Sequence, residues 1–301
     1  MVAMVTPVLI ERFGGDLGGI LGSSPTAIIA AVVGLYLELE GDESGLVGAI
    51  FNIPVGVAAT SLFVYVWRIL IPFLPLSWSR IKSLFLLLFV SFSVWVVFAC
   101  SLIFGQKALE ARYPTQSIPI WFGLTTYCIH FLVALTIVFC EQPAPPPQRK
   151  PLSPPLILLR GALSSLVIFT AIMLVLVDKG LAGVTTVFPA IFCSTMISLW
   201  LTQDRNVLTG VAGPMVLGVL SVPCFALTFY GLATVLRPLL PDAGLLLLCS
   251  VLVSYALSVL LVSVPFHFLL QCRKSLAPFK DTFEEDDELI PRRASLAPQR
   301  I

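Results

Sequence analysis

The sequence predicts an all-α, polytopic membrane protein, and three observations lead to this fold class. Of the 301 residues, 57% are hydrophobic and only 12% are charged. The apolar runs repeatedly exceed the roughly 18 to 20 residues that cross a bilayer as a helix. Open strands would leave backbone groups without hydrogen bonds in lipid, so runs of this length and number predict helices. We expect about eight or nine transmembrane helices.

Eight segments are long enough to cross a membrane, and a ninth is a fragment. The eight lie near 18–38, 46–70, 82–104, 118–140, 156–177, 181–201, 207–234 and 243–271. The fragment at 2–13 has about 12 residues, too few to cross at 1.5 Å per residue. It also lies close to the next apolar run and lacks a cleavage-site pattern, which argues against a signal peptide.

Basic residues are distributed unevenly between the two sides that these spans define. One side carries Arg12, Arg68, Arg80, Lys82, Arg149, Lys150, Arg160, Arg205 and the six basic residues after Cys272. The other side carries Lys107, Arg112, Lys179 and Arg237. Because cytosolic loops are enriched in Lys and Arg, we expect a cytosolic C-terminus.

An internal repeat is indicated by residues that match at an offset of 162 to 167 positions. The matches pair Glu11-Arg12 with Asp178-Lys179, Gly19 and Pro25 with Gly183 and Pro189, Gly48 with Gly210, Pro72 and Pro75 with Pro238 and Pro241, and Val90-Ser91-Phe92 with Val253-Ser254-Tyr255. Each match is weak alone, but all five keep the same order along the chain.

The repeat divides the chain into five parts. Residues 1–104 form a first four-helix unit with a short first helix, and residues 156–271 form a second four-helix unit. A linking helix lies within 105–140, a proline-rich cytosolic connector spans 141–155, and 272–301 is a disordered cytosolic tail. Because one extra helix separates two units of four, the second unit is inverted relative to the first. Inverted repeats of this kind are typical of secondary transporters.

The stretch GGDLGGILGSSPTAIIAAVVGL (14–35), followed by an acidic loop and a second helix of small residues, resembles small four-helix bacterial inner-membrane proteins of the GlpM type. The resemblance covers mainly residues 8–70. It implies a four-helix ancestral unit, and it supplies no catalytic residue to carry over. This chain differs from those proteins because two units are fused in tandem through a linking helix.

Candidate substrate-pathway residues lie at interruptions of the predicted helices. They are Gly22, Ser23, Ser24, Pro25 and Thr26 at the start of one span, Asn52 within the next, and Thr185, Thr186 and Pro189 at the matching place in the second unit. A broken helix N-terminus with hydroxyl groups suits an anion or a carboxylate. The alternative is close helix packing through small residues.

Ionisable candidates for proton coupling are few. Glu11 and Asp178 recur in both units, although each has a basic neighbour and fits an interfacial anchor as well. His130 lies inside the linking helix, where a hydrogen-bonded core residue is the alternative to a proton relay.

The sequence favours a secondary transporter of a small solute over an enzyme, and the interrupted helix N-termini suggest an anion as that solute. Catalytic and dinucleotide motifs, metal-ligand spacing and long basic runs are all missing, so we expect no catalytic residue, cofactor, metal or nucleic-acid partner. The alternative function is a membrane scaffold or assembly factor that packs through small-residue faces. Membrane lipid is an expected partner of either, and oligomerisation stays open.

The tail carries two short patterns. Glu285, Leu289 and Ile290 form an acidic dileucine pattern, which resembles signals that clathrin adaptors bind in endosomal, lysosomal and vacuolar proteins. Ser295 follows two arginines and resembles a kinase site, where a phosphate would add about 1.5 to 2 negative charges. We therefore expect an endosomal, lysosomal or vacuolar membrane, with the plasma membrane as the alternative.

Overall fold

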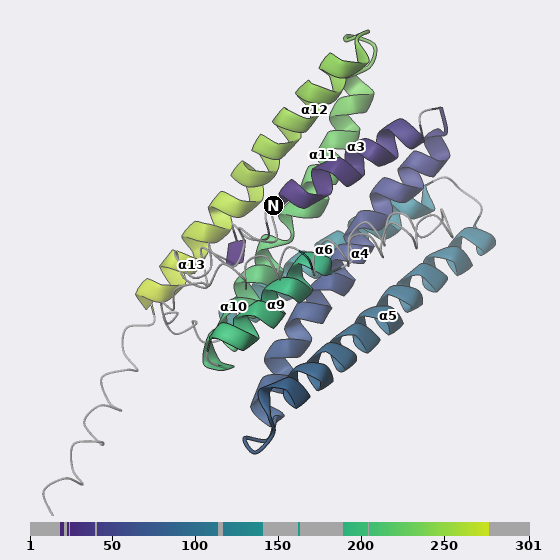
Figure 1. Ribbon diagram of the computed structural model, residues 1–301. Helices are drawn as coiled ribbons and strands as arrows, with labels where there is room; N and C mark the ends of the chain where they lie inside the picture. The colour runs from purple at the N-terminus through teal and green to yellow at the C-terminus, as the bar shows by residue number, and fades with distance from the viewer. Residues whose placement is uncertain are drawn as a thin grey trace, which may run out of the picture.

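The computed structural model describes residues 19–20, 23, 25–39, 41–113, 117–140, 162, 189–203 and 205–276. These residues form helices and their connecting turns, with no strand among them, which confirms the all-α class (Figure 1). The helices are α3 (Ile28–Glu38) after the 3₁₀ turn η1 (Pro25–Ala27), α4 (Glu43–Leu70), α5 (Arg80–Arg112), α6 (Ile118–Cys140), α9 (Ala190–Thr202), α10 (Arg205–Gly218), α11 (Ser221–Leu236), α12 (Ala243–Ser258) and α13 (Val264–Leu276). A 3₁₀ turn, η2 (Ile71–Phe73), follows α4, and a π-helical turn, η4 (Val259–Ser263), joins α12 to α13.

Five helical segments in the described residues are long and apolar enough to cross a membrane, which fits a multi-pass membrane protein. They correspond to the spans predicted at 46–70, 82–104, 118–140, 207–234 and 243–271. The spans predicted at 18–38 and 181–201 contain the shorter apolar helices α3 and α9. The span at 156–177 and the fragment at 2–13 lie outside the described residues, apart from Ala162.

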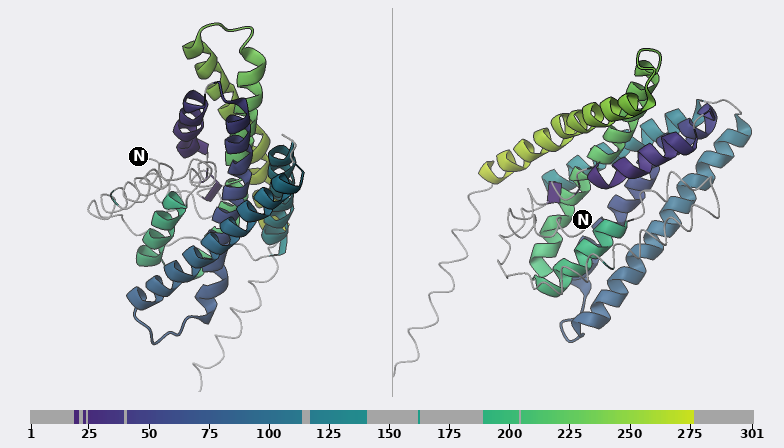
Figure 2. Two further views of the ribbon diagram at one scale, coloured as in Figure 1. Left: turned by 90° about the vertical axis from the view of Figure 1, so that its right-hand side faces the viewer. Right: turned by 45° about the horizontal axis from the view of Figure 1, so that its top comes forward.

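Two segments, α4 and the α10–α11 pair, form the centre of the bundle. Their apolar windows are 72% and 67% buried, whereas those of α5, α6 and α12–α13 are between 22% and 28% buried. The two central segments run in opposite directions, because Phe51 near the start of α4 packs on Tyr230 of α11, while Arg68 near its end donates to the Thr209 carbonyl of α10. The outer helices flank this centre (Figure 2).

The central segment of the second half is interrupted between Gly218 and Ser221. Pro223 has no amide hydrogen to donate to the carbonyl four residues earlier, which weakens the helix at this place. The amide of Val222 bonds to the Val219 carbonyl in a tighter turn, and the Ser221 hydroxyl donates to the Gly218 carbonyl at 2.8 Å. The side chain therefore satisfies a carbonyl that the interruption releases.

Each of the long outer helices α5 and α12 buries one stripe of side chains. On α5 the buried positions within the stripe are Ser83, Leu87, Ser91, Trp95 and Ala99. On α12 and η4 they are Leu246, Ser250, Ser254, Ser258 and Val262. Spacing of four residues places each set on one face of its helix, and small serines allow that face to approach the central helices closely.

The opposite ends of the bundle differ in charge. Arg68, Arg80, Lys82 and Arg205 lie at the end where α4 stops and α5 and α10 begin, which is the lower end in Figure 1, and we call this the basic end. At the other end, Asp42 caps α4 after Gly41, whose φ of 93° suits a residue without a side chain. Hydrogen bonds from the Gly45 amide, and then from the Ser44 hydroxyl, hold the pKa of the Asp42 carboxyl below its usual range.

Candidate functional site

The first candidate site is the place where the opening glycine-serine stretch meets the interruption between α10 and α11. The Ser23 hydroxyl donates to the Gly19 carbonyl at 2.7 Å and lies 3.3 Å from the Met215 carbonyl. The Ser221 hydroxyl lies 3.3 Å from the Ser23 carbonyl. The contacts of Ser23 with Met215 and of Ser221 with Ser23 join residues almost two hundred positions apart. The glycine-serine stretch therefore lies against the interruption between α10 and α11. We call this contact the central crossing.

Two glycines make the central crossing close. A Cβ atom added to Gly218 would lie 2.8 Å from the Ile20 Cα atom and 3.0 Å from the Ser23 Cβ atom. A Cβ atom added to Gly19 would lie 3.0 Å from the Pro214 Cβ atom. Small residues at such contacts let helix backbones approach more closely than larger side chains allow.

Ser23 therefore packs the crossing in this conformation. Ser23 is 2% exposed, and its hydroxyl donates to the Gly19 carbonyl. Its amide bonds to the Gly19 and Ile20 carbonyls. Neither group is left to bind a solute anion. The alternative interpretation of the glycine-serine stretch, close helix packing, describes Ser23 better than an anion site does.

The other predicted pathway residues that the structure describes lie on η1, on α4 and at the start of α9. Pro25 is buried at the start of η1, Thr26 is half-buried beside it, and Asn52 is half-buried in α4. Pro189 is buried at the N-terminal cap of α9, where its carbonyl accepts the Cys193 amide at 2.7 Å. Both prolines thus lie where a short helix begins.

Several predicted residues lie outside the described residues. They are Gly22, Ser24, Thr185 and Thr186 of the pathway set, Glu11 and Asp178 of the proton-coupling set, and Glu285, Leu289, Ile290 and Ser295 of the tail. Their proposed roles stay predictions.

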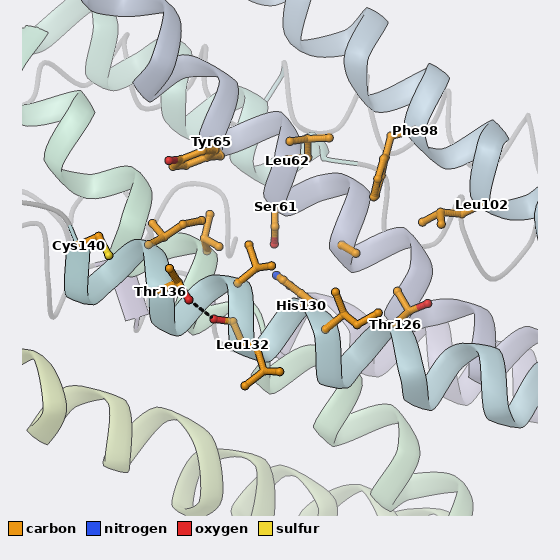
Figure 3. Close-up of a pocket in the computed structure, with 15 residues that line it drawn as sticks. Ser61, Leu62, Tyr65, Phe98, Leu102, Thr126, His130, Leu132, Thr136 and Cys140 are labelled. Carbon is orange, nitrogen blue, oxygen red and sulfur yellow. Dashed lines mark hydrogen bonds between the residues drawn. The ribbon is translucent and has the colours of Figure 1, made fainter.

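The second candidate site is a cavity of about 630 Å³ between α4, α5 and α6. Its walls are mainly aliphatic and aromatic, and Val216 of α10 also contributes to them. His130 of α6 lines the cavity, and Ser61 of α4 faces it across the space (Figure 3). We call this space the His130 cavity.

His130 and Ser61 are buried without hydrogen bonds in the described part of the chain. His130 is 6% exposed and Ser61 is 5% exposed, and neither ring nitrogen nor the hydroxyl has a partner there. The hydroxyls of Thr126 and Thr136 also line the cavity, but they donate to the Phe122 and Leu132 carbonyls of their own helix.

The sequence pointed to His130 because it is a histidine within an apolar span, but it gave no reason to select Ser61. The hydrogen bond that a core histidine normally makes is missing here among the described residues. The two residues are 69 positions apart on helices that the sequence does not pair, so only the packing of α6 on α4 brings them together.

Charged groups and metal ligands do not gather in the part of the chain that the structure describes. None of the side chains that line the His130 cavity belongs to Asp, Glu, Lys or Arg. Likewise, no three of the described His, Cys, Asp and Glu residues come together in a way that could hold a metal ion.

Comparison with protein-family models, with curated proteins and with solved structures gives no match to this chain. The resemblance to GlpM-type proteins stays a prediction from residues 8–70. Functional inference therefore depends on the geometry of the two candidate sites and on the contacts between the helices.

Proposed function

We propose that the protein is a membrane carrier, a secondary transporter in which two inverted four-helix units rock against each other about the central crossing. The observation that carries this proposal is a pair of equivalent aromatic contacts at opposite ends of the bundle. At the basic end, Trp67 of α4 meets Trp200 of α9 edge to face with ring centroids 6.5 Å apart. At the other end, Tyr36 of α3 meets Phe229 of α11 edge to face at 5.8 Å.

These contacts are related by the repeat that the sequence predicts. In the sequence repeat, Trp67 is equivalent to Phe229 at an offset of 162 positions, and Tyr36 is equivalent to Trp200 at an offset of 164 positions. In each contact a short helix of one unit packs on the central helix of the other unit. A pseudo-twofold axis in the membrane plane would produce this reciprocal arrangement, and inverted repeats carry such an axis.

The buried faces of the outer helices support the same relation. At an offset of 163 positions, the five buried residues of the α5 stripe, from Ser83 to Ala99, align with five residues of α12 and η4, from Leu246 to Val262. All five of these equivalent residues are buried as well. Ser91 falls on Ser254, and both are fully buried. The antiparallel course of α4 and α10–α11 supports an inverted relation over a parallel one.

Hydrogen bonds join the two units at the basic end, as a carrier that is closed at that end requires. At the basic end, Arg68 donates to the Thr209 carbonyl at 2.7 Å and Arg205 donates to the Leu74 carbonyl at 3.1 Å. The Trp200 indole donates to the Arg80 carbonyl at 2.9 Å. These bonds cross between the units, so we propose that this conformation is closed at the basic end.

The proposal assigns the basic end to the cytosol because Lys and Arg are enriched there. It includes a cytosolic tail that sorts the protein to an endosomal, lysosomal or vacuolar membrane through Glu285, Leu289 and Ile290. It includes no anion site at Ser23, because the hydroxyl and amide of that residue bond to backbone carbonyls.

A non-transporting scaffold is the second candidate function, and the closeness of the central crossing favours it. The lack of room for a Cβ atom at Gly19 and Gly218 suits a rigid helix junction as well as a pivot. The outward face of α5 also exposes large apolar side chains, including Phe85, Phe89 and Phe104, which another membrane helix could cover.

Cysteine accessibility separates the two functions. Met215 is fully buried beside the crossing, so Met215→Cys in a background without other cysteines reports whether water reaches the centre. We expect no labelling by a membrane-impermeant maleimide in the parent. Labelling from the basic end should rise at least several-fold when Arg68→Met and Arg205→Met remove the bonds that close it.

Lys82→Met is the matched control, because Lys82 is an exposed cation at the same end. It should leave the labelling of Met215→Cys unchanged. If the double arginine variant folds and its central cysteine stays unlabelled from both sides, the carrier proposal is wrong and the scaffold is favoured.

A further inference from the structure

We infer that the His130 cavity is a binding site for an uncharged, membrane-soluble molecule with an apolar body and one head group that both donates and accepts a hydrogen bond, such as a long-chain alcohol. The inference goes beyond the carrier proposal, because a scaffold could hold the same ligand. It depends on the size of the cavity, its lining and two buried polar groups.

The size and lining fit a small apolar molecule. A volume of about 630 Å³ lies within the range of sites that hold small ligands, and such sites are mainly apolar with a few placed polar groups. Leu62, Phe98, Leu102 and Ile137 are among the side chains that form the apolar wall. A ligand with an apolar body would replace lipid or empty space at this wall.

The polar groups define the head group. A neutral imidazole has one donor nitrogen and one acceptor nitrogen, and a serine hydroxyl can act in both ways. His130 and Ser61 point toward each other across the cavity in Figure 3 and lack partners among the described residues. A buried polar group without a hydrogen bond is costly, so a hydroxyl placed between the two would relieve both.

The lining excludes a charged head group. Moving an ion into an apolar site costs far more than moving a hydroxyl, unless an opposite charge is present. The side chains that line the cavity include no acid and no Lys or Arg. A fatty acid anion or an alkyl ammonium ion would therefore bind less well than the alcohol of the same length.

The route to the cavity is from the lipid. The lining residues Ile129, Leu132 and Val133 of α6 are 57%, 62% and 49% exposed, and most of the surface of α5 and α6 lies outside the core. Large apolar side chains exposed on spanning helices face acyl chains. A ligand dissolved in the bilayer therefore reaches the site without crossing a charged surface.

Contacts near both ends of α6 position the helix beside the cavity. Near its start, a Cβ atom on Gly123 would clash with the Phe51 carbonyl, so α6 touches the α4 backbone there. Near its end, Arg273 of α13 donates to the Val138 carbonyl at 2.7 Å. The helix is held at these two points, and His130 lies between them.

A photoreactive ligand series tests the inference on the full chain in lipid nanodiscs. The probe is a twelve-carbon alcohol with a diazirine in its chain, and the matched probes are the corresponding alkane, carboxylate and ammonium compounds. We expect the alcohol to label peptides of α5 and α6 at the cavity, and n-dodecanol to compete in a saturable way. The alkane should label lipid-facing surfaces without saturation.

Two variants and one control test whether His130 and Ser61 bind the alcohol head group. His130→Phe keeps an aromatic ring, and Ser61→Ala removes one oxygen atom, and each should weaken competition by n-dodecanol about tenfold through loss of one hydrogen bond. Thr136→Val is the control, because its hydroxyl lines the same cavity but bonds to the Leu132 carbonyl, and it should have no effect. Gel filtration and thermal unfolding verify that each variant folds.

The inference is overturned if the alkane labels the cavity as well as the alcohol does, or if the carboxylate or ammonium probe competes better than the alcohol. It is also overturned if Ser61→Ala, the smaller change, and a folded His130→Phe both bind the alcohol as the parent does. None of these results depends on whether the protein transports a solute.

Discussion

Replacing Gly218 with alanine tests whether the central crossing is as close as its geometry indicates. The new Cβ atom would lie 2.8 Å from the Ile20 Cα atom, whereas ordinary contacts begin at 3.4 Å. Backbone atoms must separate to accept it, and such overpacking typically costs about 1 to 3 kcal/mol. Alanine also favours the helix over glycine by about 0.5 to 1 kcal/mol. We expect a net loss in the free energy of unfolding that is centred at about 1 kcal/mol and reaches about 2.5 kcal/mol at most.

Gly231→Ala is the matched control on the next helix. Gly231 lies in α11, is exposed, and a Cβ atom there would meet nothing within 4 Å. The helix preference then acts alone, and the variant should gain about 0.5 to 1 kcal/mol. Reversible unfolding in mixed detergent micelles, followed by circular dichroism, measures both. If Gly218→Ala proves as stable as Gly231→Ala, the close crossing is refuted, and the pivot of the carrier proposal is refuted with it.

Three further predictions concern other parts of the chain. Trp200→Ala and Phe229→Ala should each destabilise the fold by about 3 to 5 kcal/mol in the same unfolding assay, because each removes a buried ring from one of the two aromatic contacts. The protection of the first-turn amides of α4 against hydrogen exchange, taken relative to the intrinsic exchange rate at each pH, should fall as the pH falls through the lowered pKa of Asp42, whose ionised form makes the cap. Asp42→Asn should remove this change in protection. Alanine at both Leu289 and Ile290 should move a fluorescently tagged protein to the plasma membrane, and an unchanged location in cells would contradict the sorting signal.

Long apolar runs bounded by polar residues were predictable from the sequence. The span expected at 118–140 is the helix Ile118–Cys140, because its charge-free run stops at Glu141 and the proline-rich connector. The helix α4 likewise contains the span 46–70 and continues through Pro54. In such runs the bilayer leaves the backbone no alternative to a helix, so composition determines the element.

Contacts between distant segments were not predictable. The run at 207–234 was expected as one helix, but it is interrupted after Gly218, where Ile20 and Ser23 pack against it. No local pattern distinguishes this glycine from others in the run, since the space that it leaves is filled from the other end of the chain. The pairing of Ser61 with His130 was missed for the same reason.

The inverted repeat that we propose accounts for the place of the His130 cavity through the linking helix α6. A single helix cannot obey a twofold axis that relates the two units, so α6 must meet them differently. On its side toward the second unit, Phe131 packs on Phe266 with ring centroids 5.9 Å apart, and Val138 accepts the bond from Arg273. On its side toward the first unit, the space beside His130 is left open. A ligand there would contact α6 together with α4 and α5 of the first unit, and the second unit would contribute Val216 of α10 to the same wall. It would therefore contact the two proposed units unequally.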